Sequence, residues 1–293
     1  MNANTAQSQT AEGNNAAFEF VKALAFELSS GKIDLPSFPD VAVRVRRALA
    51  DDRTTVEQVT RIVGSEPALA ARLLKMSNSA MLNRSGKQVT DLKAAIARMG
   101  YNMVRSAAIS FAMAQIRASA NLKAVEKPLK DLWQQSTYVA ALSYVVAKKQ
   151  TRINPDEAFL AGLLHGIGKL YILSRHERHP VLFADEEALA QVIRDWHANV
   201  GKAIMENWEM AESLVNAIGD QEDIEREHEG SADLTDVVIC ANMMAAYYEQ
   251  PADLELNMQG VNAFGKLSLD AASTTAIIAE CGEEIAALRE ALG

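Results

Sequence analysis

The chain has 293 residues, of which 49% are apolar and 23% charged, and this balance excludes disordered and fibrous proteins in favour of a globular protein with a substantial core. Its two cysteines, Cys240 and Cys281, lie far apart and match no metal-ligand spacing, which excludes a disulfide framework and indicates a reducing compartment. The net charge of −9 is uneven, because residues 1–150 hold 20 Lys and Arg against 12 Asp and Glu (+8), whereas residues 151–293 hold 9 against 26 (−17). This asymmetry fits either the steering of a partner or solvated helix faces of opposite bias.

The N-terminal residues 1–15 are polar and contain no basic start followed by an apolar run. We therefore expect a disordered tail rather than a signal peptide. No apolar stretch of the chain approaches the ~20 residues that a membrane-spanning helix needs. Together with the two cysteines, this predicts a cytoplasmic protein.

Short segments with helical spacing of apolar residues follow in the N-terminal half. The alternating valines at 41–45 would also fit a strand, but the helix-start pattern around Pro39 favours a helix. Helices this short are marginal alone, so tertiary packing must stabilise them. We expect them at 18–28, from about 40, 55 and 67, and at 91–99 and 102–118, the last two separated by Gly100.

Longer helices are expected in the C-terminal half. One runs from near Pro128 to about Lys149, and the next begins with the cap Asn154-Pro155 and continues through the motif at 165–169. The acidic residues 221–230 read as a loop, and no Val/Ile/Thr-rich run bounded by turns predicts a sheet. The fold class is therefore all-α, with further helices at 186–207, 211–220, 234–249 and 269–292.

His165 begins the one stretch with catalytic form, His165-Gly166-Ile167-Gly168-Lys169. A metal-dependent phosphohydrolase of the HD kind needs a histidine followed at once by an aspartate. Adjacent helical positions point about 100° apart, so both side chains reach one metal, which makes a hydroxide and neutralises phosphate charge. Gly166 follows His165 here and has no ligand atom.

Gly162 and Gly166 lie four residues apart and form a small strip on which a neighbouring helix can pack closely. Each glycine costs about 1 kcal/mol of helix propensity relative to alanine, and close packing is a reasonable offset. We therefore expect His165 to be a hydrogen-bonded histidine of the core or of a pocket. Lys169 either lines the remainder of an anionic pocket or is a solvated helix lysine.

Five segments in order resemble the motifs of HDOD domains, the HD-related output domains of bacterial signalling proteins in the superfamily of HD and HD-GYP phosphohydrolases. The segments are LPSFP at 35–39, SEPALAARLLKMSNSA at 65–80, LWQQS at 132–136, AGLLHGIGK at 161–169 and the run 197–208. The resemblance covers about residues 30–250, and its signature positions are Pro36, Pro39, Pro67, Asn78, Ser79, His197 and Trp208. It implies a regulatory output function.

The resemblance also implies an architecture. We expect an N-terminal helical subdomain at 16–120 and a larger HD-like helical bundle at 125–293, with no significant sheet.

At the positions that the resemblance implies for metal ligands, most residues of this chain are not ligands. Gln135 stands at the first histidine position and Gly166 at the aspartate of the dyad. Gln221 and Glu222 stand at the paired histidines, and Asn242 stands near the closing aspartate. A neutral amide is a poor ligand for a divalent cation in competition with water.

Three side chains, His165, His197 and Glu222, could still coordinate a metal, but scattered groups give little affinity. We therefore expect no catalytic residue, no metal and no cofactor. The vestigial HD site then consists of Gln135, His165, Gly166, Lys169, Gln221, Glu222 and Asn242.

The sequence thus predicts a non-catalytic signal-transduction output or adaptor protein. It would bind a protein partner in bacterial signalling, or a small anionic ligand in the vestigial pocket. The first alternative is a metal-dependent phosphohydrolase with an altered ligand set. A third is a DNA-binding regulator whose helices 55–64 and 67–76 form a helix-turn-helix in the basic half. The second of these begins with apolar residues that cannot read base edges, and a pI of 5.2 opposes phosphate affinity.

Overall fold

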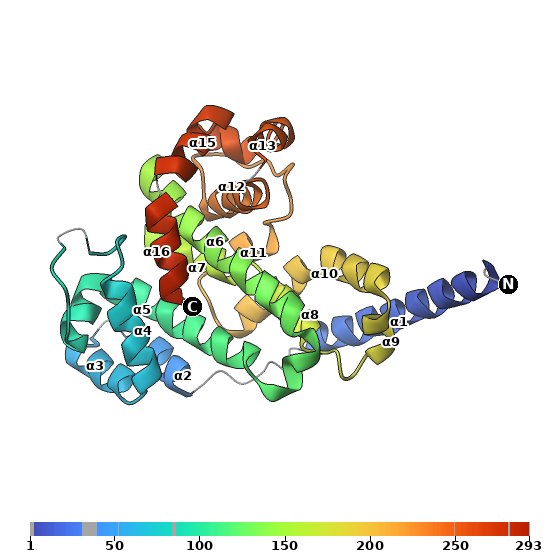
Figure 1. The fold of residues 1–293 in the computed structure, drawn as a ribbon, viewed down its shortest axis with the longest axis horizontal. Helices are drawn as coiled ribbons and strands as arrows, with labels where there is room; N and C mark the ends of the chain where they lie inside the picture. Colours follow the sequence, from blue (N-terminus) through green and yellow to red (C-terminus); the bar gives the residue numbers. More distant parts are fainter. Residues whose placement is uncertain are drawn as a thin grey trace.

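The structure is a computed structural model, and it describes residues 3–30, 40–51, 53–83, 86–248, 250–280 and 282–292. All regular structure in these residues is helical, which confirms the all-α fold class (Figure 1). None of the described helices is both long and apolar enough to cross a membrane.

The N-terminal half of the chain contains five helices in the described residues, followed by a short 3-10 helix. They are α1 (Ala3–Ser30), α2 (Asp40–Ala48), α3 (Val56–Gly64), α4 (Pro67–Ser77), α5 (Leu92–Arg117) and η1 (Ala120–Val125).

The C-terminal half is built around α6, which crosses the molecule next to α7 and α12 (Figure 1). Its helices are α6 (Glu126–Gln150), α7 (Pro155–Leu164), α8 (Ile167–Leu173), α9 (Pro180–Ala184), α10 (Glu186–Asn207), α11 (Glu212–Gly219), α12 (Leu234–Ala246), α13 (Pro251–Asn257), α14 (Asn262–Lys266), α15 (Ala271–Glu280) and α16 (Gly282–Leu292).

Local caps explain where several of these helices begin. The Thr55 hydroxyl accepts a hydrogen bond from the Gln58 backbone N–H, and the Gln58 side chain accepts one from the Thr55 N–H, which forms a capping box at α3. Pro67 occupies the first turn of α4, where its missing N–H costs nothing. Asn154 caps α7 by accepting from the Asp156 N–H at 2.9 Å. These starts agree with the sequence prediction to within one residue.

Gly100 interrupts α5 as predicted. Its φ of +73° and ψ of 165° lie outside the helical region, and glycine adopts this left-handed φ without the steric cost of a Cβ atom. The residues on either side of it are helical, so α5 consists of two helices joined at a kink.

The expected tail at 1–15 differs from the structure, because α1 already begins at Ala3. The segment is rich in Ala and Gln, has no proline and contains good helix formers. The C-terminal part of α1 packs on α9 and α10 (Figure 1), and its Phe20 and Leu24 are buried. Glu27 accepts a hydrogen bond from Tyr171 and forms a 3.1 Å ion pair with Arg175.

The prediction of a single helix that continues through residues 165–169 is wrong, because the structure has two helices there. The first, α7, ends at Leu164, and α8 starts at Ile167. Gly166 has φ −90° and ψ 10°, and its low helix propensity permits this break.

The C-terminal prediction also differs, since 269–292 contains α15 and α16, and α13 and α14 were not predicted. The last helix, α16, packs on α4 and α5 of the N-terminal half as well as on α6. Buried apolar residues from both halves form one continuous cluster. The division at 120–125 coincides with η1 and stays a prediction.

Candidate functional site

The side chains at the HD-site positions come from helices that pack directly on one another. Gln135 lies on α6, His165 and Gly166 form the α7–α8 junction, and Lys169 lies on α8. The helix α6 packs on α7 and α12, while α10 packs on α8 and α11. The remaining positions are His197 on α10, Gln221 and Glu222 directly after α11, and Asn242 on α12.

Two glycines let α6 approach the α7–α8 junction closely. A Cβ atom on Gly162 would lie 2.7 Å from the Ala140 Cα. One on Gly166 would lie 2.6 Å from the Leu132 Cδ1 and 3.2 Å from the Ser136 Oγ. All three distances are shorter than ordinary van der Waals contacts. The predicted small strip therefore faces α6, and Gly166 also leaves no room for a side chain unless Leu132 moves.

His165 is fully buried, and its ring is held in one tautomer. Its Nδ1 lies 2.7 Å from the Gly162 carbonyl oxygen, and since a carbonyl can only accept, Nδ1 carries the proton. Burial lowers the pKa of His165 from 6.5 to about 4, so the imidazole is neutral at physiological pH. The Nε2 atom therefore presents a lone pair, and none of the described residues forms a hydrogen bond with it.

Gln221 is held against this histidine by its backbone contacts. Its amide nitrogen donates to the His165 carbonyl oxygen at 2.7 Å and to the Ile218 carbonyl oxygen at 3.0 Å. Its buried Oε1 atom has no hydrogen-bond partner in the part of the chain that the structure describes. Gln221 Oε1 and His165 Nε2 are thus two buried acceptors that a bound molecule or water could satisfy.

His197, Glu222 and Lys169 supply the titratable groups on the other side of the cluster. His197 Nε2 lies 2.9 Å from Glu222 Oε1, and this hydrogen bond lowers the pKa of Glu222. Burial lowers the pKa of Lys169, while the nearby Glu222 opposes that shift. His197 is buried whereas the Glu222 side chain is 46% exposed, so this hydrogen-bonded pair reaches solvent at Glu222.

Gln135 and Asn242 pair with each other. The Gln135 amide nitrogen donates to Asn242 Oδ1 at 3.2 Å, and both side chains are half-buried. Two amides thus bind each other where the resemblance implies a histidine and an aspartate. The structure brings Gln135 beside Asn242, and it brings His165, Lys169, His197, Gln221 and Glu222 into a second connected group.

The other signature positions have structural contacts. Asn78 closes the end of α4: it donates to the Val89 carbonyl oxygen at 2.7 Å and accepts from the Val89 N–H at 2.8 Å. Ser79 donates to the Met76 carbonyl oxygen at 2.7 Å. The Trp208 carbonyl oxygen accepts from Arg46 at 2.8 Å, which ties α2 to the end of α10. Pro36 and Pro39 lie outside the described residues.

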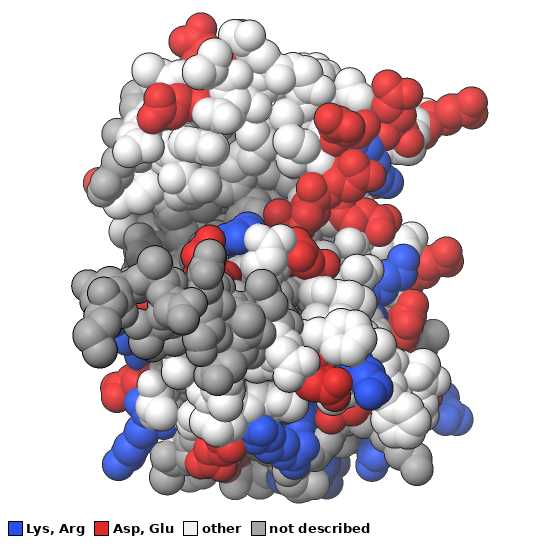
Figure 2. Space-filling view, turned by 90° about the vertical axis from the view of Figure 1, so that its right-hand side faces the viewer, with Lys and Arg blue, Asp and Glu red and all other residues white. Residues whose placement is uncertain are grey.

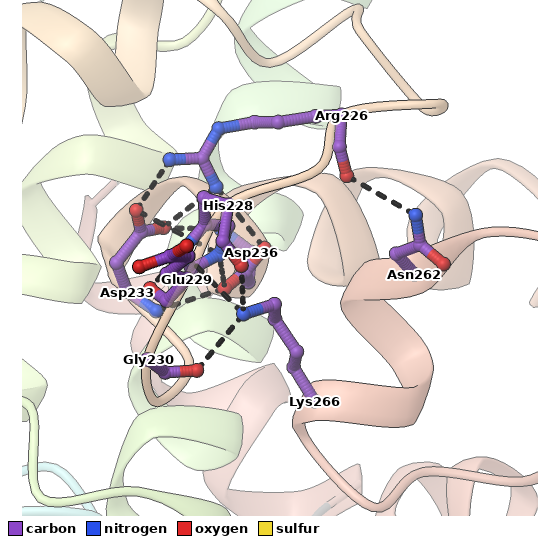
Figure 3. Close-up of polar contacts among 8 residues, drawn as sticks. All are labelled: Arg226, His228, Glu229, Gly230, Asp233, Asp236, Asn262 and Lys266. Atoms are coloured by element: carbon purple, nitrogen blue, oxygen red, sulfur yellow. Dashed lines mark hydrogen bonds and ion pairs between the residues drawn. The ribbon is translucent and has the colours of Figure 1, made fainter.

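A polar cluster that the sequence analysis missed lies on the acidic loop (Figure 3). His228, Asp233 and Asp236 bring three ligand atoms within 4.8 Å of one another, the one such group of three His, Cys, Asp or Glu side chains found in the described residues. Arg226 binds both carboxylates, with its closest contacts at 2.5 and 3.2 Å. Lys266 donates to the His228 carbonyl oxygen at 2.7 Å. The positive charges in this cluster are therefore the side chains of Arg226 and Lys266, and the network anchors the loop to α12 and α14. The capping-box spacing of the two aspartates was the signal that could have found it.

The charge asymmetry is visible on the surface. Figure 2 shows Asp and Glu gathered at the upper right of one face, with Lys and Arg more frequent, and mixed with acids, toward its lower part. The acidic side chains are thus concentrated on one part of this face, whereas the basic ones share theirs with acids.

Comparison with known proteins agrees with this helical architecture. The sequence profile of the HDOD domain family matches residues 35–224. An uncharacterised protein of Treponema pallidum (strain Nichols) is 23% identical over 237 residues, which are 77% of this chain and 45% of that protein. The chain therefore spans about half the length of this curated relative.

Solved structures share the fold. A protein of Shewanella amazonensis SB2B, whose name provisionally assigns it to the metal-dependent phosphohydrolases, superposes with a TM-score of 0.74 at 24% identity, over 95% of this chain and 100% of that one. An HDOD domain protein of unknown function from Geobacter sulfurreducens gives 0.65 at 23% identity, over 95% and 96%. A protein of Marinobacter aquaeolei VT8, provisionally named for signal transduction, gives 0.59 at 18% identity, over 89% and 60%.

Proposed function

The chain belongs to the HDOD domain family, and on that premise we propose that it is a regulatory signal-transduction protein that acts by binding rather than by catalysis. Its ligand would be a protein partner, or a small anion at the cluster around His165. The observation that carries this proposal is that buried side-chain atoms of the cluster, among them His165 Nε2 and Gln221 Oε1, have no hydrogen-bond partner in the described residues and are available to a ligand.

The described side chains at the HD-site positions do not fit a divalent metal centre. The buried side-chain atoms of this cluster without a hydrogen-bond partner in the described residues are two imidazole nitrogens, His165 Nε2 and His197 Nδ1, and one amide oxygen, Gln221 Oε1, and none of them is a carboxylate. Hard divalent cations prefer carboxylates, and catalytic zinc sites use three protein ligands. The carboxylate of Glu222 is bound to His197, and Gly166 has no side chain and no space for one unless Leu132 moves.

One observation favours the competing hypothesis of a phosphohydrolase with altered ligands. In metal sites, the ligating histidine donates its other ring N–H to a carbonyl or carboxylate, which fixes the tautomer. His165 has this arrangement, with Nδ1 bonded to the Gly162 carbonyl and Nε2 bare. A hydrogen-bonded core histidine has it too, so the distinction requires a measurement.

The decisive experiment measures metal and turnover together. The protein is purified without chelator, and bound metal per chain is determined by mass spectrometry. Phosphomonoester and cyclic-dinucleotide hydrolysis are then assayed with Mn²⁺, Mg²⁺ or Fe²⁺. We expect far less than one metal per chain and no turnover above that of His165→Ala. Near-stoichiometric metal, with turnover that His165→Ala abolishes, would overturn the proposal.

The DNA-binding alternative has less support. Its recognition helix would be α4, whose Lys75 donates to the Glu290 carbonyl oxygen at 2.7 Å and forms a 3.4 Å ion pair with that residue. Arg72 on the same helix donates to Ser110 at 3.2 Å. Two cations of α4 are thus engaged within the protein. Salt-dependent retention on duplex DNA at low ionic strength is the test, and its absence removes this hypothesis.

The protein-partner hypothesis is tested separately. Affinity capture of the tagged protein from cells, followed by identification of bound chains, is expected to recover a specific partner. Recovery of nothing beyond background counts against it.

A further inference from the structure

A pocket on the side of α6 that carries Trp133 lies apart from the HD-site positions. It forms where the chain turns from α5 through η1 into α6, the lower part of the molecule in Figure 1. Its volume is about 890 Å³, and its lining includes Arg117, Lys123, Lys130 and Trp133, together with Ala286 from α16. The volume lies within the ~300–1,000 Å³ that is usual for small-molecule sites.

The pocket gathers positive charge from three elements. Arg117 ends α5, Lys123 belongs to η1, and Lys130 lies in α6. No ion pair joins any of the three to a carboxylate in the part of the chain that the structure describes. Glu126 is the one carboxylate among the described residues of the lining, so these residues carry a net charge of +2, from three cations and one anion. A concave surface of this kind attracts anions.

Arg117 in the pocket lining stacks on an aromatic ring, and no carboxylate of the described residues forms an ion pair with it. The Arg117 guanidinium stacks on Trp133, with 5.1 Å between its carbon and the ring centroid. Burial lowers the pKa of Arg117, and the pKa of Arg72 is lowered by burial and by the charge of Arg117. Two partly buried guanidinium groups therefore repel each other, and an anion placed between or beside them would relieve that repulsion.

The lining also has an uncharged part. Leu122 and Ala286 supply apolar surface, and the exposed Gln134 side chain supplies an amide. A ligand therefore meets cations on one portion and apolar or neutral groups on another. Arginine and lysine together are typical of phosphate recognition, because arginine donates in a bidentate fork and lysine supplies a mobile point charge.

We propose that this pocket, formed by the end of α5, η1, α6 and α16, binds a phosphate-bearing small molecule of about nucleotide size. Arg117 and the two lysines bind the phosphate groups, while Leu122 and Ala286 contact the uncharged part. The proposal concerns a site other than the cluster around His165, so it stands whether or not that cluster catalyses a reaction.

The pocket is placed to influence the other site. Trp133 and Gln134 line the pocket, and the next two residues of α6, Gln135 and Ser136, contact Asn242 and the Gly166 position respectively. A ligand that shifts or stiffens this turn of α6 acts on both faces of one helix. This is the route by which an anion could control a regulatory protein.

The test is a calorimetric titration of the 293-residue chain with ATP, GTP and inorganic pyrophosphate, in EDTA at about 50 mM salt, where charge interactions are weakly screened. Adenosine and guanosine are the uncharged controls. The variants Lys123→Ala and Lys130→Ala remove exposed pocket lysines, and Lys127→Ala is the matched control, because Lys127 is an exposed lysine of the same segment that does not line the pocket. Quenching of tryptophan fluorescence, compared with Trp133→Phe, locates the bound probe.

We expect saturable binding of at least one phosphate probe and none of the nucleosides. Each of the two pocket variants should weaken binding about tenfold, and Lys127→Ala less than about twofold, since a lost charge-assisted contact corresponds to roughly this factor. The quenching should disappear in Trp133→Phe. Absence of binding by all three phosphate probes, or equal effects of Lys127→Ala and the pocket variants, would overturn the proposal. Loss of binding in Lys169→Ala but not in the pocket variants would also overturn it, and would instead support anion binding at the cluster around His165.

Discussion

Replacement of Gly168 by alanine is the sharpest test of how α8 and α10 hold the cluster around His165. A Cβ atom at this position would lie 1.9 Å from the His197 carbonyl oxygen and 2.9 Å from the Gly201 nitrogen. Both are backbone atoms, so no side-chain rotation relieves the overlap. The two helices must separate by about 1 Å or more to reach an ordinary contact distance.

The cost follows from two opposing effects. Overpacking of a close helix contact costs typically 1–3 kcal/mol, and a backbone clash this short belongs at about 3 kcal/mol. Alanine recovers about 1 kcal/mol of helix propensity. The free energy of unfolding should therefore fall by about 2 kcal/mol or more. Because the clash is with the backbone of His197, the 2.9 Å hydrogen bond from that residue to Glu222 should weaken as well.

The assay is urea denaturation followed by circular dichroism, with Gly265→Ala as the matched control. A Cβ atom on Gly265 would meet nothing within 4 Å, so that variant should be as stable as the parent or up to about 1 kcal/mol more stable. A Gly168→Ala protein with the stability of the parent would refute the close approach of α8 and α10.

Three further predictions concern single side chains. Burial lowers the pKa of His165 to about 4 in the folded protein, so the unfolded chain binds this proton first as pH falls. The free energy of unfolding should therefore drop between about pH 6.5 and 4, by up to about 3 kcal/mol. Urea denaturation at several pH values should show this loss, and a His165→Asn protein whose free energy of unfolding depends on pH in the same way would contradict it. The hydrogen bond with His197 lowers the pKa of Glu222 below 4.5, so its stabilisation is complete above that pH and lost as pH falls further, and Glu222→Gln should flatten the pH dependence of stability in that acidic window. Asn78→Ala removes two hydrogen bonds to Val89, so it should lower the free energy of unfolding by about 2 kcal/mol and lower the melting temperature as well. An unchanged melting temperature would show that these two hydrogen bonds do not stabilise the fold.

Local signals in the chain were enough for most helix starts. Thr55, Pro67 and Asn154 act at helix N-termini through contacts with residues two or three positions away, or through their own backbone geometry. Such contacts are fully encoded in a short stretch of sequence. Gly100 similarly marks the kink in α5 because only its own φ is involved. The all-α class followed from these local signals together with the absence of strand patterns.

The short C-terminal helices and the break at His165 lacked such signals. The motif at 165–169 has continuous apolar spacing, and the sequence alone gives no reason to end α7 at Leu164. In the structure, Leu132 and Ser136 of α6 lie against Gly166, so the break is associated with a contact to a helix some 30 residues earlier. α1 shows the same dependence, because Glu27 is placed by Tyr171 and Arg175 more than 140 residues away.

The residue types at the positions predicted for an HD site can be read from the chain alone, including the glycine after His165 and the amides at 135, 221 and 242. Their contacts depend on the packing of whole helices. The packing of α6 on α12 allows Gln135 to bind Asn242, and the turn after α11 aims the Gln221 amide at the His165 carbonyl. Gln135 and Asn242 are 107 residues apart in the sequence, and Gln221 and His165 are 56 residues apart. Contacts over such separations depend on how whole helices pack, which no local pattern of residues specifies.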